Sequence, residues 1–221
     1  MALPHEEKPL GLQVPPVPAG AEIPPEPPDV GGRALSVAAR LLAGATTFFF
    51  LAFVFAYFYL RSLNVDNMWR PAHVKPDQTL GVVFIVCLVL SAATAIIAGR
   101  GMKARSPGWV GPAAASVALG LIAIIAQCIG FTKQNFGPTD GAFASVFVTW
   151  TAFYMIAMLA TMYWLETQVA TELRARRSPA TGDGDIKDPD RLIAPGLDAA
   201  VFYWSYLAGI GVITYVVLYL L

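Results

Sequence analysis

The sequence contains few of the side chains on which catalysis or metal binding usually depends. Its 221 residues include two cysteines and two histidines, and only 14% of them are charged, whereas an average soluble domain has about 25% charged residues. So few cysteines and histidines exclude a disulfide scaffold and a zinc domain. The formal net charge of zero also excludes the basic surface of a nucleic-acid-binding protein.

Long apolar segments dominate the sequence instead. Hydrophobic residues make up 56% of the chain, and the mean hydropathy is +0.58. Five segments reach the roughly 20 residues needed to cross a hydrocarbon core, and none of them contains Asp, Glu, Lys, Arg or His. The sequence therefore predicts an all-α integral membrane protein with five transmembrane helices. The predicted spans are residues 41–60, 80–98, 109–131, 141–165 and 199–221.

The placement of lysine and arginine predicts the orientation of these spans. With the N-terminus inside, eleven of the fifteen basic residues lie in cytoplasmic segments, and the others are Arg61, Arg70, Lys75 and Lys133. Basic residues concentrate on the cytoplasmic side of membrane proteins. We therefore expect an N-in, C-out topology.

Two polar regions flank or interrupt the spans. Nine of the seventeen prolines fall within residues 1–32, and because proline lacks a backbone donor and resists helix formation, residues 1–33 are predicted to be a disordered cytoplasmic tail. This tail is either a solvated leader or a docking arm for a partner. Residues 34–221 form the predicted transmembrane domain. Its fourth helix is predicted to continue past Leu165 through "ETQVATELRARR", which has no Gly or Pro. The polar segment that follows, "SPATGDGDIKDPD", is predicted to be a cytoplasmic loop.

The residues inside the spans do not form a redox or proton-transfer site. Membrane haem needs axial His, Met or Cys ligands, but His5 and His73 lie outside the spans, and Cys87 and Cys128 lie on different spans. Proton pumps and ion-coupled carriers usually keep an ionisable residue within the membrane, and these spans have none. The pattern predicts a non-catalytic membrane subunit without its own metal or haem.

Aromatic and polar residues of the spans are the candidates for contacts with lipid or with a partner. The first span, "TTFFFLAFVFAYFYLR", presents a broad aromatic surface that could line a groove for acyl chains, pack on another subunit or simply face lipid. An arginine can bind a phosphate with several donors, and membrane tryptophans prefer the headgroup level. Four tryptophans are predicted to lie near the interfaces: Trp69, Trp109, Trp164 and Trp204. The predicted lipid or subunit contacts are Arg61, Trp69, Gln127, Phe153 and Trp204. Among these, Gln127 needs a hydrogen-bond partner in an apolar medium, so it should face another helix or a headgroup.

Several motifs occur in a fixed order along the spans. The first span ends in "FFFLAFVFAYFYLR" and is followed by "MWRP"; the second contains "LVLSAATAIIAGRG"; the third and fourth contain "IIAQCIGF" and "DGAFASVFVTWTAF"; the last reads "VFYWSYLAGIGVITYVVLYLL". Over roughly residues 41–221, this order resembles subunit III of the haem-copper terminal oxidases in its short five-helix form. The proline-rich tail lies outside the resemblance.

The chain departs from that family at the ionisable membrane positions. Glutamates, histidines and an aspartate that the family usually carries are replaced here by neutral residues, which argues against a role in proton handling. The replaced positions are Thr46, Gly130, Tyr154, Ala157, Ser205 and Ala208.

The resemblance implies an accessory role in aerobic electron transport. Such a subunit packs on the catalytic subunit I and other oxidase subunits, holds phospholipid in a V-shaped cleft of its helix bundle, and has no redox centre. The haem and copper of the complex, which reduces oxygen to water, are expected in the partner subunits, and the location in a bacterial plasma membrane. One alternative is a subunit of a quinol oxidase or nitric oxide reductase with the same fold. Another is a small-solute transporter, which predicts a polar pathway through the bundle.

Overall fold

The computed structural model describes residues 28–64, 69–104, 106–177 and 190–221. Within these ranges the chain forms helices joined by short connections, and no strand occurs. The long helices are α1 (Pro28–Ser62), α2 (Gln78–Lys103), α3 (Val110–Thr132), α4 (Ala142–Arg177) and α5 (Asp190–Tyr215). A 3₁₀ turn, η1 (Pro107–Trp109), precedes α3, and a π-helical turn, η2 (Val216–Leu220), continues α5.

All five long helices are apolar enough to cross a membrane. The shortest of them, α3, has 23 residues and is about 35 Å long at the usual helical rise, which exceeds the roughly 30 Å of a hydrocarbon core. Helices α1 and α2 contain the first two predicted spans, and α3 and α4 each begin one residue after the predicted start of theirs. The last predicted span begins inside α5 and runs on through η2. The prediction of an all-helical chain with five helices long and apolar enough to cross a membrane is therefore confirmed for the described residues.

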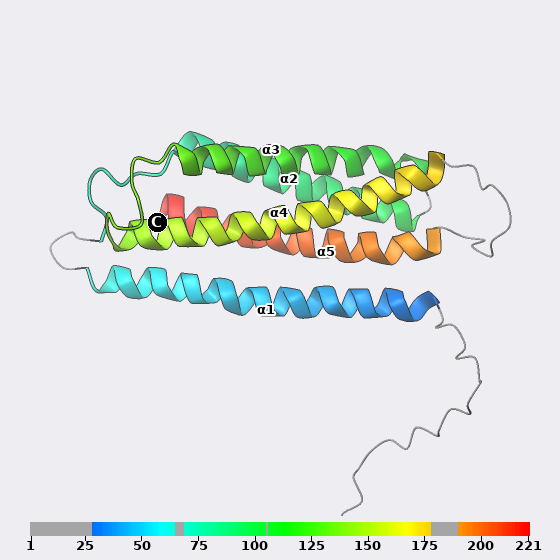
Figure 1. Cartoon of the computed structure of the whole chain (residues 1–221), viewed down its shortest axis with the longest axis horizontal. Coiled ribbons are helices and arrows are strands. Elements are labelled where there is room, and N and C mark those ends of the chain that lie inside the picture. The colour runs from blue at the N-terminus through cyan, green and yellow to red at the C-terminus, as the bar shows by residue number, and fades with distance from the viewer. Residues whose placement is uncertain (1–27, 65–68, 105, 178–189) are drawn as a thin grey trace, which may run out of the picture.

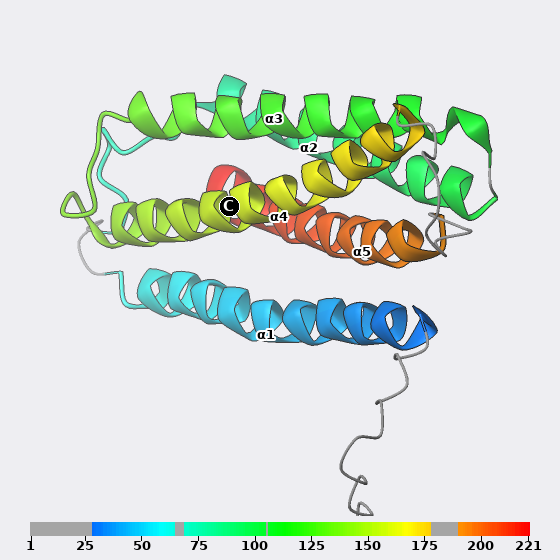
Figure 2. The same cartoon turned by 45° about the vertical axis from the view of Figure 1, so that its right-hand side comes forward.

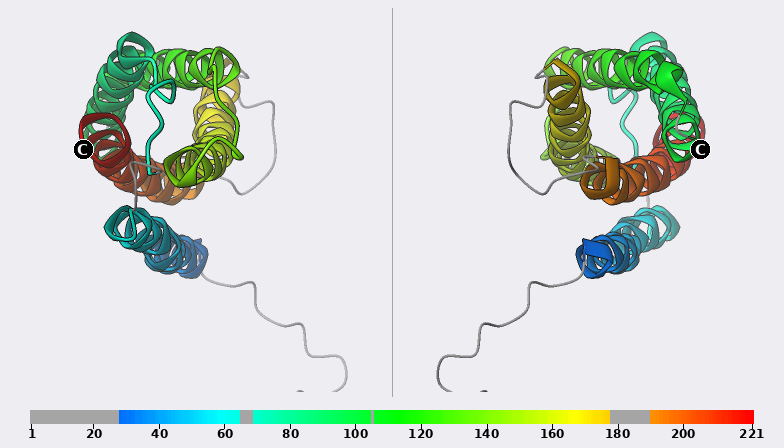
Figure 3. Two further views of the ribbon diagram at one scale, coloured as in Figure 1. Left: turned by 90° about the vertical axis from the view of Figure 1, so that its left-hand side faces the viewer. Right: turned by 90° about the vertical axis from the view of Figure 1, so that its right-hand side faces the viewer.

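The helices run side by side along one axis (Figures 1 and 2). Viewed along that axis, α2, α3, α4 and α5 surround a common centre, and α1 lies outside this group (Figure 3). Helix α1 packs against α5 and α4. We call α2–α5 the four-helix bundle, with α1 as its peripheral helix.

Aromatic side chains with satisfied polar atoms fill the centre of the four-helix bundle. Trp150 and Tyr154 of α4 are fully buried against α5. The indole nitrogen of Trp150 donates a hydrogen bond to Thr214 Oγ1 at 3.0 Å, and the Tyr154 hydroxyl donates to the Leu207 carbonyl oxygen at 2.8 Å. Buried tyrosine and tryptophan usually find such partners, so α4 and α5 are joined both by packing and by hydrogen bonds.

The structure corrects one boundary from the sequence. Helix α1 begins at Pro28, so residues 28–33, which were predicted to belong to the disordered tail, are helical. Proline is favourable in the first turn of a helix, and Gly32 lets α1 approach α5 closely, because a Cβ atom there would lie 2.8 Å from Pro195 Cγ. The predictions for residues 1–27 and for the connection at 178–189 fall outside the described residues. The predicted continuation of α4 past Leu165 is confirmed.

Candidate functional site

Three aromatic rings form a compact cluster at the C-terminal end of α1. Tyr57 of α1, Trp69 of the following connection and Phe143 of α4 are all buried and meet edge to face. The ring centroids of Tyr57 and Trp69 lie 5.2 Å apart, and those of Trp69 and Phe143 lie 5.7 Å apart. Edge-to-face pairs of this kind add about 0.5–1.5 kcal/mol each beyond their buried area. This aromatic end cluster anchors the end of α1 to α4.

Two guanidinium groups flank the aromatic end cluster. The exposed Arg61 lies with its guanidinium carbon 5.9 Å from the Tyr57 ring centroid and donates a long hydrogen bond, 3.5 Å, to the Tyr57 hydroxyl. The Arg70 guanidinium carbon lies 4.5 Å from the Phe143 ring centroid, within cation–π range. The structure thus brings Arg61 and Trp69 together, with Tyr57 between them. Arg61 keeps donors free for an anionic group beside a buried aromatic base.

The connections that hold Trp69 explain its fixed position. Its backbone N–H donates to Asn64 Oδ1 at 2.9 Å, and its carbonyl oxygen accepts from the Phe143 N–H at 3.1 Å. The turn before α4 contains Gly141 with φ 136°, a conformation that a residue with a Cβ atom rarely adopts. This turn delivers Phe143 to the cluster, so the tryptophan is bonded on both sides.

An exposed strip of phenylalanines continues from the cluster between α1 and α4. Phe49 and Phe53 of α1 lie 5.2 Å and 6.0 Å, centroid to centroid, from Phe153 of α4. Phe53 also stacks on Trp150 at 5.8 Å with an interplanar angle of 22°. Phe49 and Phe153 remain 43% and 45% exposed, and Phe53 is half-buried. The phenylalanine strip (Phe49, Phe53 and Phe153) is therefore open on its outer side to lipid or to another subunit.

Two hydroxyl pairs attach α1 to α5 near the start of its apolar segment. Thr46 Oγ1 and the Tyr203 hydroxyl lie 2.8 Å apart, and Thr47 Oγ1 and the Tyr206 hydroxyl lie 2.7 Å apart. Each threonine donates its proton to a carbonyl oxygen of its own helix, so each tyrosine must be the donor in its pair. These contacts were missed in the sequence, although adjacent threonines in one span and tyrosines three residues apart in another were a usable signal.

Gln127 is buried in the four-helix bundle and is not a member of the aromatic end cluster. Its side chain is 5% exposed and lies close to the side chain of Tyr219. The Tyr219 carbonyl oxygen in turn accepts from Gln78 Nε2 at 2.8 Å. Gln127 therefore faces another helical segment, η2, as expected for an amide side chain in an apolar medium.

The structure corrects the placement of Trp204. The sequence predicted an interfacial tryptophan available to lipid or to a subunit, but the Trp204 side chain is fully buried. Its indole nitrogen donates to Ser91 Oγ at 3.0 Å, in the middle of α2. Ser91 and Ser116 donate to each other's carbonyl oxygens at 2.7 and 2.8 Å. Trp204 is therefore a core residue, which closes a hydrogen-bonded junction of α2, α3 and α5.

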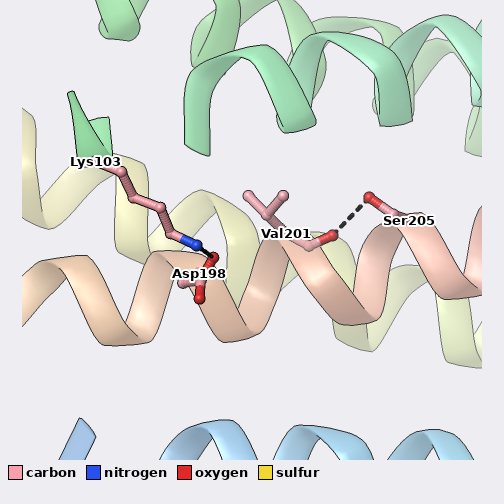
Figure 4. Close-up of polar contacts among 4 residues, drawn as sticks. All are labelled: Lys103, Asp198, Val201 and Ser205. Atoms are coloured by element: carbon pink, nitrogen blue, oxygen red, sulfur yellow. Dashed lines mark hydrogen bonds and ion pairs between the residues drawn. The ribbon is translucent and has the colours of Figure 1, made fainter. Parts of the chain in front are cut away.

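Several positions where the resembled family has ionisable residues carry hydroxyls that the helices satisfy. Ser205 Oγ donates to the Val201 carbonyl oxygen at 2.7 Å on its own helix (Figure 4). Tyr154 and Thr46 also donate to backbone carbonyl oxygens, as described above. These groups can hydrogen-bond, but they do not change charge near neutral pH. The arrangement can therefore support packing and binding rather than proton transfer.

Metal-ligating side chains do not gather in the part of the chain that the structure describes. No group of three or more His, Cys, Asp or Glu residues there is placed to hold a metal ion. The Cys128 sulfur lies 4.0 Å from the Met155 sulfur, while Cys87 is on α2 and half-buried. The exposed His73 lies in the connection before α2.

No family model matches the sequence, and no curated protein matches it. The functional interpretation therefore depends on the motif order and on the geometry of the aromatic end cluster, the phenylalanine strip and the bundle interior.

Proposed function

We propose that this chain is a non-catalytic, lipid-binding subunit of a respiratory haem-copper oxidase, of the type represented by subunit III. The order of motifs along the five spans supports this proposal. In this role the chain packs on catalytic subunit I and on other oxidase subunits in a bacterial plasma membrane. The partner subunits carry the haem and copper and reduce oxygen to water in aerobic electron transport.

The observation that carries the proposal is the contrast between the interior and the peripheral helix. The interior is filled by fully buried aromatic rings, Trp150, Tyr154 and Trp204, whose polar atoms are bonded within the bundle. A small-solute transporter would need a polar pathway where these rings lie. The aromatic surface of α1, by contrast, is exposed and suits a lipid or a partner subunit. These features favour an accessory subunit over a transporter.

The proposed orientation is N-in and C-out. It places the aromatic end cluster, with Arg61 and Arg70, at the outer membrane surface. The division that the resemblance implies would follow the line of contact between α1, which is the peripheral helix (Figure 3), and α4 of the four-helix bundle. Phospholipid would then lie along the phenylalanine strip, with its phosphate near Arg61.

The first prediction concerns the subunits that co-purify with this chain. The affinity-tagged chain, purified gently from its native membrane, should bring with it a haem-containing subunit, Soret absorbance and oxygen consumption. The same chain expressed alone should show neither, because it offers no haem-ligand set. Stoichiometric haem on the isolated chain would contradict the proposal, and solute uptake by vesicles containing only this chain would favour a transporter. A co-purified complex that consumes nitric oxide or quinol would identify the alternative members of the same fold.

The second prediction concerns phospholipid at the end of α1. Arg61→Ala should lower the phospholipid retained by the gently solubilised complex about fivefold at this site, the loss expected for one basic residue at a membrane surface. Lipid bound per protein is measured by native mass spectrometry. The control is Lys133→Ala, since Lys133 follows α3 at the same end and is exposed but does not touch the aromatic end cluster. Equal retention in Arg61→Ala and the wild type would exclude the phosphate role of Arg61.

A further inference from the structure

A cavity of about 220 Å³ lies at the other end of the molecule, where α1, α2 and α5 meet. Ser36 and Arg40 of α1, Lys103 of α2, and Asp198 and Phe202 of α5 contribute to its walls. Figure 4 shows Lys103 reaching from the end of α2 towards Asp198. This cavity is separate from the aromatic end cluster, which occupies the C-terminal end of α1.

The charges around the cavity leave an excess of positive charge. Lys103 Nζ lies 2.7 Å from Asp198 Oδ1, so these two charges compensate each other. Arg40 adds a second cation, and its guanidinium has no ion pair or hydrogen bond among the residues that the structure describes. The Lys103 and Asp198 side chains are 63% and 46% exposed, and ion pairs this exposed are held weakly. An anionic ligand could therefore recruit both cations.

The position of these groups along the helices specifies where such a ligand would lie. Arg40 directly precedes the apolar segment of α1, Lys103 ends α2, and Asp198 directly precedes the apolar segment of α5. All of them therefore lie at the boundary between the apolar spans and the polar segments, which is the headgroup level of a bilayer. Phe202, 43% exposed and one turn further into the α5 span, offers an apolar wall on the membrane side.

We propose that this cavity binds the phosphate group of an anionic phospholipid. Arg40 donates hydrogen bonds from its guanidinium and Ser36 from its hydroxyl to the phosphate oxygens, Lys103 adds its charge, and an acyl chain passes along Phe202. Arginine suits this task because its fork of donors matches a phosphate. The proposal requires only that the helices span a membrane. It does not depend on the oxidase assignment or on the role of Arg61.

The test measures lipid selectivity of the purified full-length chain in mixed micelles. Equimolar phosphatidylglycerol and phosphatidylcholine are supplied, and bound lipids are counted by native mass spectrometry. The wild type should retain phosphatidylglycerol preferentially, and Arg40→Gln should reduce that retention about fivefold, the loss expected for one basic residue at an anionic surface. Arg100→Gln is the matched control, because Arg100 is exposed in the last turn of α2 at the same end but does not line the cavity. Equal losses in the two variants would overturn the site in favour of a general charge effect.

A second variant gives a change of the opposite sign. Asp198→Asn removes the carboxylate that occupies Lys103, so it should increase the retention of phosphatidylglycerol, whereas simple damage to the fold would decrease it. Retention should also survive an excess of inorganic phosphate, because free phosphate lacks the apolar contact with Phe202. Displacement by inorganic phosphate would exclude a lipid as the ligand. Absence of phosphatidylglycerol selectivity in the wild type would also overturn the proposal.

Discussion

Replacing Gly211 with valine is expected to destabilise the folded bundle by about 3 kcal/mol, the upper end of the range for overpacked cores. Gly211 is buried on α5, and a Cβ atom there would overlap the Tyr154 hydroxyl of α4 and a methyl group of Leu88 of α2. The Tyr154 hydroxyl is bonded to the Leu207 carbonyl oxygen at 2.8 Å. Relief of the overlap would therefore break a buried hydrogen bond as well as separate helices.

The chain supplies a matched control two residues away. Gly209 lies on the same helix but is exposed, and a Cβ atom there would meet nothing within 4 Å. Gly209→Val should leave stability unchanged or raise it slightly, because valine has the better helix propensity. The free energy of unfolding of the purified protein is measured by titration of mixed micelles with a denaturing detergent. Similar results for the two variants would contradict the packing of α5 against α2 and α4.

The elements that the sequence predicted correctly are those set by local composition. Each apolar segment is long enough to define a membrane span on its own, so the five helices could be located without knowledge of their neighbours. The extension of α4 past Leu165 was also predictable, because helix formers continue there without Gly or Pro. The aromatic end cluster was partly predictable too, since Arg61 and Trp69 are close in sequence and need only a short connection to meet.

The features that the sequence did not reveal depend on residues far apart in the chain. Helix α1 begins before its apolar segment, and there Gly32 packs closely on Pro195 of α5, a contact that no local pattern encodes. The Lys103–Asp198 ion pair, which joins α2 to α5, was also missed because its two residues are far apart in the sequence. Both contacts depend on the tertiary arrangement of the helices, which the local sequence does not specify.

The burial of Trp204 is the clearest example of a feature that the local sequence could not predict. A tryptophan close to the start of a predicted span has the local pattern of an interfacial residue. Its burial depends instead on the small residues opposite it, because Gly120 of α3 leaves room for the indole ring; a Cβ atom at Gly120 would lie 3.1 Å from Trp204 Cζ2. The pairing of Gly120 with Trp204 could be recognised only once the helices had been arranged around a common centre.

Trp204→Ala is expected to destabilise the protein by about 3–5 kcal/mol, the typical cost of truncating a buried tryptophan. The fully buried indole fills the junction of α2, α3 and α5, and alanine would leave a cavity that these helices can only partly close. The control is Trp164→Ala, since Trp164 is only partly buried on α4 and its loss should cost clearly less. The free energy of unfolding is measured by the same detergent titration.

Trp204→Phe separates packing from hydrogen bonding at this junction. Phenylalanine keeps most of the aromatic volume but cannot donate to Ser91 Oγ, which accepts from the indole at 3.0 Å. The Ser91 hydroxyl still donates to the Ser116 carbonyl oxygen, so no buried donor is left without a partner. The loss of the indole bond should therefore cost only about 0.6 kcal/mol, the average for hydrogen bonds between membrane helices. If Trp204→Phe were as damaging as Trp204→Ala, the hydrogen bond would be the main contribution. If Trp204→Ala cost no more than Trp164→Ala, Trp204 would lie at the interface after all.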